Sequence, residues 1–235
     1  MCESVPLECL PPPAEEDQGL PRRTVLAGIG SLLLAGCMPT STAQARREAT
    51  ATAPVPVPHQ PRPKPKRPSP PAYEIVRRES WGAESLKDNH DPMARITKLT
   101  VHHTAEIAGM DQRVDADLVK GIQNFHRNER GWADIGYHWI IGRDGKVYEG
   151  RALNVQGAHA GGGNNVENLG ISVIGDFSTA MPPTAAVRTL TLFLRAQQKR
   201  YGIPMEQVFG HREFKATACP GDALFAWLER FRQTA

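Results

Sequence analysis

The segment "GHREFKATACPGD", residues 210–222, contains two side chains that could bind a metal ion together. His211 and Cys219 stand eight positions apart in it. Imidazole nitrogens and thiolates are both zinc ligands, and a catalytic zinc site uses three protein ligands and leaves a fourth position for water. The two residues could therefore be part of a zinc site, or they could be unrelated residues of a loop that turns at Pro-Gly-Asp. A zinc site would require a third ligand from elsewhere in the chain.

The best third ligand among the eight histidines lies in the segment "LTVHHTA", residues 99–105. Its Thr and Val content predicts a strand, in which successive side chains point to opposite faces. His102 shares its face with two threonines, whereas His103 shares its face with Leu99 and Val101. We therefore predict that His102 is a metal ligand and that His103 is a structural histidine.

The remaining patterns predict the elements that would position these residues. Strands are expected over residues 97–105 and 169–177, and a β-hairpin with Arg-Asp-Gly-Lys at its turn over residues 135–151. Helices are expected over residues 115–131, 182–202 and 221–233. The expected apolar face of the first helix consists of Val114, Leu118, Ile122 and Phe125. Because strands and helices alternate irregularly, the predicted class is α/β with a mixed sheet.

Residues 1–37 are predicted to be an export signal. Arg22 and Arg23 precede an apolar run that is too short for a bilayer span of about 20 residues, and they resemble a twin-arginine signal. The run ends in Leu34-Ala35-Gly36-Cys37, which resembles a lipobox, so that Cys37 would be the site of lipidation. The alternative is an ordinary signal cleaved elsewhere, in which Cys37 has no role. The lipobox predicts an exported, membrane-anchored lipoprotein facing the periplasm or cell wall.

Residues 38–72 are predicted to be a disordered, basic linker. Prolines at every second or third position exclude helix and sheet ladders and favour extended polyproline II. We interpret the segment as a solvated spacer between a membrane anchor and a folded domain.

The folded part, residues 73–235, is nearly neutral, with 20 Lys and Arg side chains against 19 Asp and Glu. This balance argues against nucleic acid as a partner, because phosphate binding needs a basic face. Cys219 is the only cysteine in this part, so it has no partner there for an intramolecular disulfide. A lone thiol in an exported protein needs another role, and metal binding would supply one.

Five ordered motifs give residues 73–232 a specific resemblance to amidase type 2 domains. They are "VHHTA", "GWADIGYHWIIGRDGKVYEGR", "GAHAGGGN", "LGISVIGDF" and "GHREFKATACPGD". This family comprises the peptidoglycan recognition proteins and the phage-type zinc N-acetylmuramoyl-L-alanine amidases. The resemblance implies a single domain over residues 73–235, with a central mixed sheet flanked by helices. It also implies one zinc ion at the floor of a groove.

The resemblance assigns roles to residues by motif. His102, His211 and Cys219 match the family's zinc ligands. Tyr137 matches a tyrosine beside the attacking water, and Thr217 matches a position that faces the scissile carbonyl, so both are expected to be catalytic.

Two further motif positions are expected to line the groove and bind substrate, namely His159 and Asn164. For His159, structural support is the open alternative. The glycine run 161–163 is one residue longer than the family's usual loop, which leaves the roles of Asn164 and Asn165 open. We expect Lys215 to be a surface residue, and His126 and His138 to be structural.

The implied activity is zinc-dependent hydrolysis of the amide between N-acetylmuramic acid and L-alanine, which releases stem peptides from peptidoglycan. Many recognition proteins of the family bind peptidoglycan without cleaving it and lack the cysteine ligand. The presence of Cys219 therefore favours an enzyme over a non-catalytic peptidoglycan-binding or tethering lipoprotein. The expected partners are peptidoglycan and, through the lipid anchor, a membrane. The chain is expected to be a monomer.

Overall fold

The computed structural model describes residues 72–107 and 109–234. The predicted export signal lies outside the described residues, and so does the predicted linker apart from Ala72. Within the described ranges, no helix is long and apolar enough to cross a membrane.

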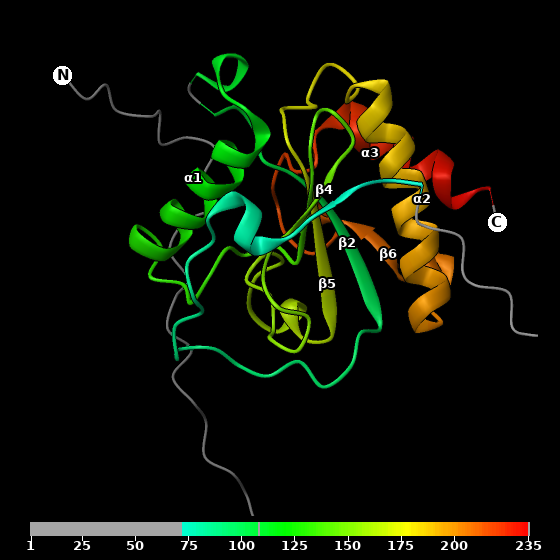
Figure 1. Cartoon of the computed structure of the whole chain (residues 1–235). Helices are drawn as coiled ribbons and strands as arrows, with labels where there is room; N and C mark the ends of the chain where they lie inside the picture. The colour runs from blue at the N-terminus through cyan, green and yellow to red at the C-terminus, as the bar shows by residue number, and fades with distance from the viewer. Residues whose placement is uncertain (1–71, 108, 235) are drawn as a thin grey trace, which may run out of the picture. The chain divides into compact units, whose positions relative to one another are not determined.

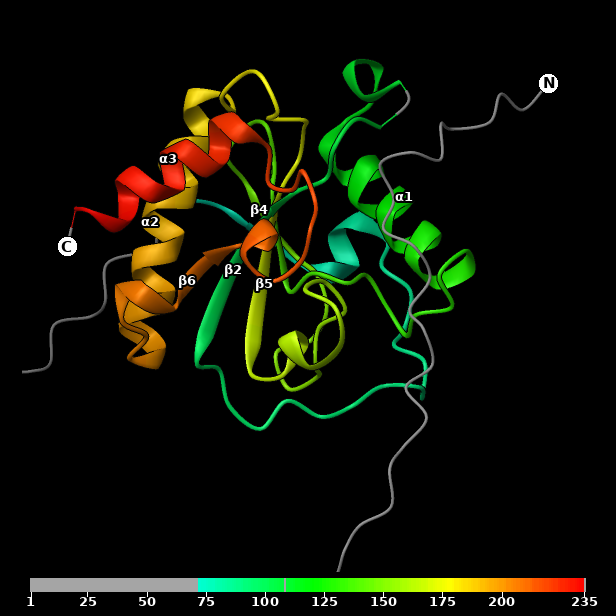
Figure 2. The same ribbon diagram turned by 180° about the vertical axis from the view of Figure 1, so that it is seen from behind.

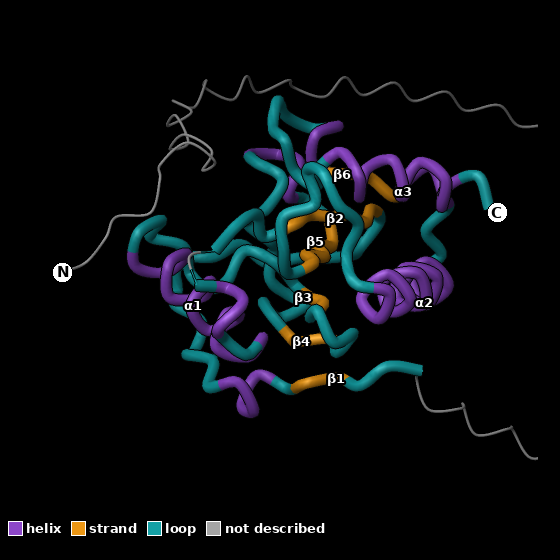
Figure 3. The backbone as a smooth tube through the Cα atoms, turned by 90° about the horizontal axis from the view of Figure 1, so that it is seen from above, coloured by secondary structure: helices purple, strands orange, loops and turns teal. Residues whose placement is uncertain are grey.

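A six-stranded sheet carries helices on both faces (Figures 1 and 3). The strands are β1 (Ile75–Val76), β2 (Lys98–His103), β3 (Trp139–Ile141), β4 (Val147–Glu149), β5 (Asn168–Val173) and β6 (Val208–Gly210). The α-helices are α1 (Asp115–Asn128), α2 (Thr184–Tyr201) and α3 (Asp222–Arg232). Short 3₁₀ helices cover Arg78–Trp81, Met110–Gln112, Gly162–Asn165, Met205–Gln207 and His211–Glu213.

The strand order is β1-β4-β3-β5-β2-β6, and the sheet is mixed, as predicted. β3 and β4 form the expected antiparallel hairpin, whereas the other neighbouring strands run parallel. β2 lies between β5 and β6, and both β2 and β5 are almost entirely buried. Because β2, β5 and β6 are parallel, their carboxyl ends lie at one edge of the sheet.

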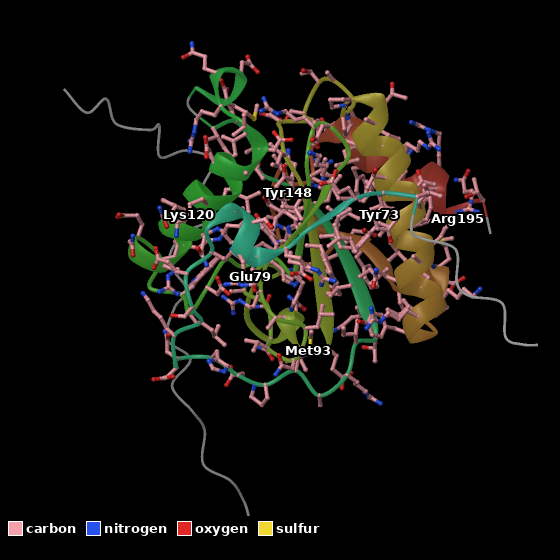
Figure 4. The ribbon with its side chains drawn as sticks, in the orientation of Figure 1. Tyr73, Glu79, Met93, Lys120, Tyr148 and Arg195 are labelled. Carbon is pink, nitrogen blue, oxygen red and sulfur yellow. The ribbon has the colours of Figure 1, made fainter. Side chains whose placement is uncertain are left out.

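The helices cover opposite faces of the sheet. Leu190, Phe193 and Leu194 of α2 pack in one apolar core with Leu224 and Leu228 of α3. On the other face, Leu118 and Val119 of α1 pack with Ile135, Ile140 and Tyr148. Figure 4 shows the same division, with Lys120 of α1 and Arg195 of α2 on opposite sides of the ribbon. The predicted sheet flanked by helices is therefore confirmed.

The predicted apolar face of α1 is wrong in part. Val114 precedes the helix and is 65% exposed. The buried face instead includes the polar residues Gln123 and Arg127. Gln123 donates to Asp134 Oδ1 at 2.7 Å, and Arg127 donates to the Ser85 carbonyl at 2.6 Å. These hydrogen bonds compensate for the burial of polar side chains, which a pattern based on hydrophobicity cannot detect.

Candidate functional site

The predicted metal ligands meet at the carboxyl edge of the sheet. His102 lies near the end of β2, His211 directly follows β6, and Cys219 lies in the loop before α3. Figures 1 and 2 show the segment between β6 and α3 beside this end of β2. One ligand atom from each residue lies within 4.8 Å of the other two. Both histidines are buried and Cys219 is half-buried.

Backbone contacts hold Cys219 against β2. The His103 backbone N–H donates to Cys219 Sγ at 3.4 Å, and the same sulfur lies 3.6 Å from His102 Nδ1. The Arg212 backbone N–H donates to the Cys219 carbonyl at 3.0 Å. The His103 N–H therefore orients the thiol, and the Arg212 N–H holds the Cys219 backbone.

Burial determines the protonation states of the three groups. It lowers the pKa of His102 well below its usual value, and the charges of nearby histidines add to this effect. It also lowers the pKa of His211 to about 4, with a smaller contribution from the Lys215 charge. Burial raises the pKa of the Cys219 thiol to about 12. Without metal, the site therefore contains two neutral imidazoles and a protonated thiol at neutral pH.

This donor set fits a zinc ion. The buried Nε2 of His211 has no hydrogen-bond partner among the described residues. An unpartnered polar atom is costly in a protein interior, and a cation held by the cluster would compensate that cost. Two imidazoles and one thiolate are ligands that zinc favours, and three protein ligands leave a position for water.

The two predicted catalytic residues lie beside this cluster. The ring of Tyr137 is 5.2 Å from that of His102, centroid to centroid. Burial and the neighbouring Cys219 raise the pKa of Tyr137, so its phenol keeps its proton at neutral pH. The Cys219 backbone N–H donates to Thr217 Oγ1 at 3.3 Å. This bond uses the oxygen as an acceptor and leaves the O–H of Thr217 as a donor.

The predicted substrate-binding residues differ in their exposure. His159 is only 6% exposed, and its ring nitrogens contact His102 Nε2 and the Asn168 carbonyl at 3.0 and 3.1 Å. These contacts favour the structural-support alternative for His159. Asn164 is half-exposed in the segment Gly162–Asn165, and its carbonyl accepts from Asn168 Nδ2 at 2.8 Å. Substrate contact by either residue stays a prediction.

The structure adds residues that the sequence reasoning missed. Asn165 Oδ1 accepts from the backbone N–H groups of both His159 and Ala160, at 2.9 and 2.8 Å. In the sequence, only the asparagine pair after the glycine run pointed to these two hydrogen bonds. Lys215, expected to be a surface residue, is half-buried, and its charge helps to lower the pKa of His211.

Three other histidines have structural contacts, as predicted. His103 Nδ1 accepts from the Phe177 N–H at 3.3 Å, and His126 Nδ1 accepts from the Gly136 N–H at 3.1 Å. His138 Nδ1 accepts from the Gly170 N–H at 3.0 Å. None of the three belongs to the metal-binding cluster.

Known proteins are similar to this chain in sequence and in fold. A family model described as N-acetylmuramoyl-L-alanine amidase, Amidase 2, matches residues 92–222. The chain belongs to the amidase type 2 family. Peptidoglycan recognition protein 1 of Bos indicus is 35% identical over 158 residues, which cover 67% of this chain and 83% of the relative.

Two further members of the amidase type 2 family show its range. N-acetylmuramoyl-L-alanine amidase of Homo sapiens is 40% identical over 131 residues, which cover 54% of this chain and 23% of that protein. The solved structure of peptidoglycan recognition protein LE, in complex with monomeric diaminopimelic acid-type peptidoglycan, aligns with a TM-score of 0.60. It is 30% identical, and the alignment covers 66% of this chain and 92% of that one. The family thus includes an amidase and peptidoglycan-binding recognition proteins.

Proposed function

We propose that this chain is a zinc-dependent amidase that cleaves the bond between N-acetylmuramic acid and L-alanine in peptidoglycan. The observation that carries the proposal is the convergence of His102, His211 and Cys219 within 4.8 Å. Further support comes from the similarity to a human amidase and from the fold shared with a peptidoglycan-bound recognition protein.

The chemistry divides among the metal and two hydroxyl groups. A zinc ion in this site would act as a Lewis acid and bring the pKa of a water towards about 7. The neutral phenol of Tyr137 orients the attacking water and helps to move its proton. The Thr217 O–H donates to the carbonyl oxygen of the scissile amide as negative charge develops there. The stem peptide leaves with a free amino group on L-alanine.

The alternative function is peptidoglycan binding without cleavage. The complex of the recognition protein LE favours it, because a similar fold there binds a peptidoglycan fragment. The complete ligand set and the neighbouring Tyr137 favour hydrolysis. Binding alone needs neither a thiol nor a phenol at this edge of the sheet.

We also propose that the chain is exported and anchored to a membrane by a lipid on Cys37, with residues 38–72 as the spacer. The support is the lipobox-like sequence that ends at Cys37. The relatives described above are animal proteins, so this part of the proposal rests on the sequence pattern alone.

Mass spectrometry of purified peptidoglycan after incubation with the full chain tests the activity. We expect free stem peptides that begin with L-alanine, and we expect 1,10-phenanthroline to stop their release and added zinc to restore it. Cys219→Ser should release none while still sedimenting with peptidoglycan. If the wild-type chain sediments with peptidoglycan but releases no peptide, the binding alternative replaces the amidase.

A further inference from the structure

His159 contacts the metal-binding cluster without belonging to it. Its Nδ1 lies 3.0 Å from Nε2 of His102, and its Nε2 lies 3.1 Å from the Asn168 carbonyl oxygen. The other ring nitrogen of His102, Nδ1, lies 3.6 Å from Cys219 Sγ. A continuous series of contacts therefore runs from a backbone carbonyl through two imidazoles to the thiol.

The carbonyl determines where the protons sit in this series. A carbonyl oxygen only accepts hydrogen bonds, so His159 Nε2 must carry a proton. Burial opposes a charge on the ring, and the neutral ring then has an acceptor at Nδ1. His102 Nε2 must donate to that acceptor. The remaining nitrogen of His102, Nδ1, is left with a lone pair, and it is the nitrogen that faces Cys219.

The surroundings of His159 hold its ring in place. Asn165 Oδ1 accepts the N–H groups of His159 and Ala160 and so anchors the loop. Two glycines make room for the ring. A Cβ at Gly157 would lie 2.4 Å from His159 Cδ2, and a Cβ at Gly170 would lie 2.5 Å from the same atom. Any residue other than glycine at position 157 or 170 would therefore collide with the His159 ring.

We propose that His159 is a positioning residue that locks His102 in the tautomer whose Nδ1 binds the metal. The inference rests on the proposed zinc site. It assigns His159 no contact with the substrate, and it gives Asn165 the task of holding the loop that carries the ring. Partners of this kind fix ligand orientation in metal sites, and their loss typically costs about 10- to 100-fold in metal affinity.

Long-range ¹H–¹⁵N NMR of the metal-free full chain reads the histidine tautomers directly. We expect the ring proton of His102 on Nε2 and that of His159 also on Nε2. A His102 proton on Nδ1 would overturn the proposal. This measurement needs neither zinc nor turnover, so it can fail while the amidase proposal stands, and it can succeed if no amidase activity is found.

Two substitutions separate the two hydrogen bonds of His159. In His159→Asn the side-chain oxygen can take the place of Nδ1 and keep an acceptor for His102. In His159→Gln the amide group takes the place of Nε2, so the contact with the Asn168 carbonyl remains and the acceptor for His102 is lost.

Competition with a chromogenic chelator gives the zinc dissociation constant of each variant. We expect His159→Gln to bind zinc about 10- to 100-fold more weakly and His159→Asn to stay within about threefold of wild type. A purely structural role predicts equal losses or the reverse order, and either result rejects positioning. Thermal melting of the metal-free variants checks folding. If neither variant folds, the His102 tautomer measured in the wild-type chain decides whether the proposal stands.

Discussion

Burial sets the protonation and hydrogen bonding of the single residues in this site. His211 Nε2 is enclosed without a hydrogen-bond partner among the described residues, and the Cys219 thiol has its pKa raised to about 12. Each group alone would be a cost to the fold. Together with His102 they form a donor set that a zinc ion would satisfy. The same residues scattered over the surface would have no such preference.

Thr217 offers a test of the proposed reaction at this scale. Replacing it with valine keeps the volume and removes the O–H, so we expect kcat to fall on the order of 10²-fold, as for loss of an oxyanion donor. KM should change little, because the hydrogen bond strengthens as charge develops. Initial rates on soluble muropeptides would measure both constants.

Thr217→Ser is the matched control, since it keeps the hydroxyl, and it should retain most of the activity. The zinc content of both variants should equal that of wild type. Full turnover by the valine variant would remove Thr217 from the mechanism.

His126 makes stability depend on pH. Burial lowers its pKa to about 3, whereas an unfolded histidine titrates near 6.5. The unfolded chain therefore binds the proton first, and stability that is complete above pH 6.5 is lost as the pH falls towards 3. His126 alone should cost about 2 kcal/mol between pH 7 and pH 5. Urea unfolding at the two pH values measures this loss.

His126→Asn keeps an acceptor for the Gly136 N–H and removes the titration, so the pH dependence should become shallower. The exposed His90 offers a matched control, because His90→Asn makes the same substitution at an exposed position. An unchanged slope in His126→Asn would show that His126 does not contribute.

At the scale of elements, β5 shapes the site as well as the sheet. Gly170 pairs with Thr100 of β2, and an added Cβ would lie 2.5 Å from the ring of His159. The strand passes close to the loop that carries His159 because this position has no side chain. The packing of β5 against the loop that carries His159 thus depends on the absence of a Cβ at Gly170.

Gly170→Ala tests this packing. We expect a loss of about 1–3 kcal/mol in the free energy of unfolding, because the ring or the strand must move. Gly163 is the matched control, since its Cβ would meet nothing within 4 Å. Gly163→Ala should change stability by less than about 0.5 kcal/mol. Urea unfolding of the metal-free variants measures both changes. Equal free energies of unfolding for the two alanine variants would contradict the packing argument.

At the scale of the whole molecule, the proposed anchor would decide where the site can act. The amidase type 2 match covers residues 92–222, and the lipobox-like sequence ends more than 50 residues earlier. An extended polyproline spacer of residues 38–72 would span on the order of 100 Å at about 3.1 Å per residue. A lipid on Cys37 would then hold the domain within reach of the cell wall.

Cys37→Ala tests the anchor in cells. We expect the variant to move from the membrane fraction to the soluble fraction, because the lipid is attached to that thiol. Cys9→Ala removes another cysteine of the same segment and should stay with the membrane. Retention of the Cys37 variant in the membrane would place the anchor elsewhere.

Much of the fold could be predicted from the sequence because its signals are local. The periodic patterns placed α1, α2, α3 and the β3–β4 hairpin within a few residues of their observed bounds. The predicted strands around β2 and β5 extended too far at their carboxyl ends. The alternation of faces along β2 separated His102 from His103, and the ordered motifs brought together the three residues that now lie within 4.8 Å.

Other features depend on contacts between residues far apart in the sequence. The buried face of α1 contains Gln123 and Arg127 because distant loops supply their hydrogen-bond partners. The sequence by itself determined which residues could bind a metal, since this depends on side-chain chemistry and strand alternation. Only the tertiary structure decided that His159 contacts His102 and that Asn165 anchors its loop. Hydrogen bonds require atoms at about 3 Å, and folding alone sets such distances between separate segments.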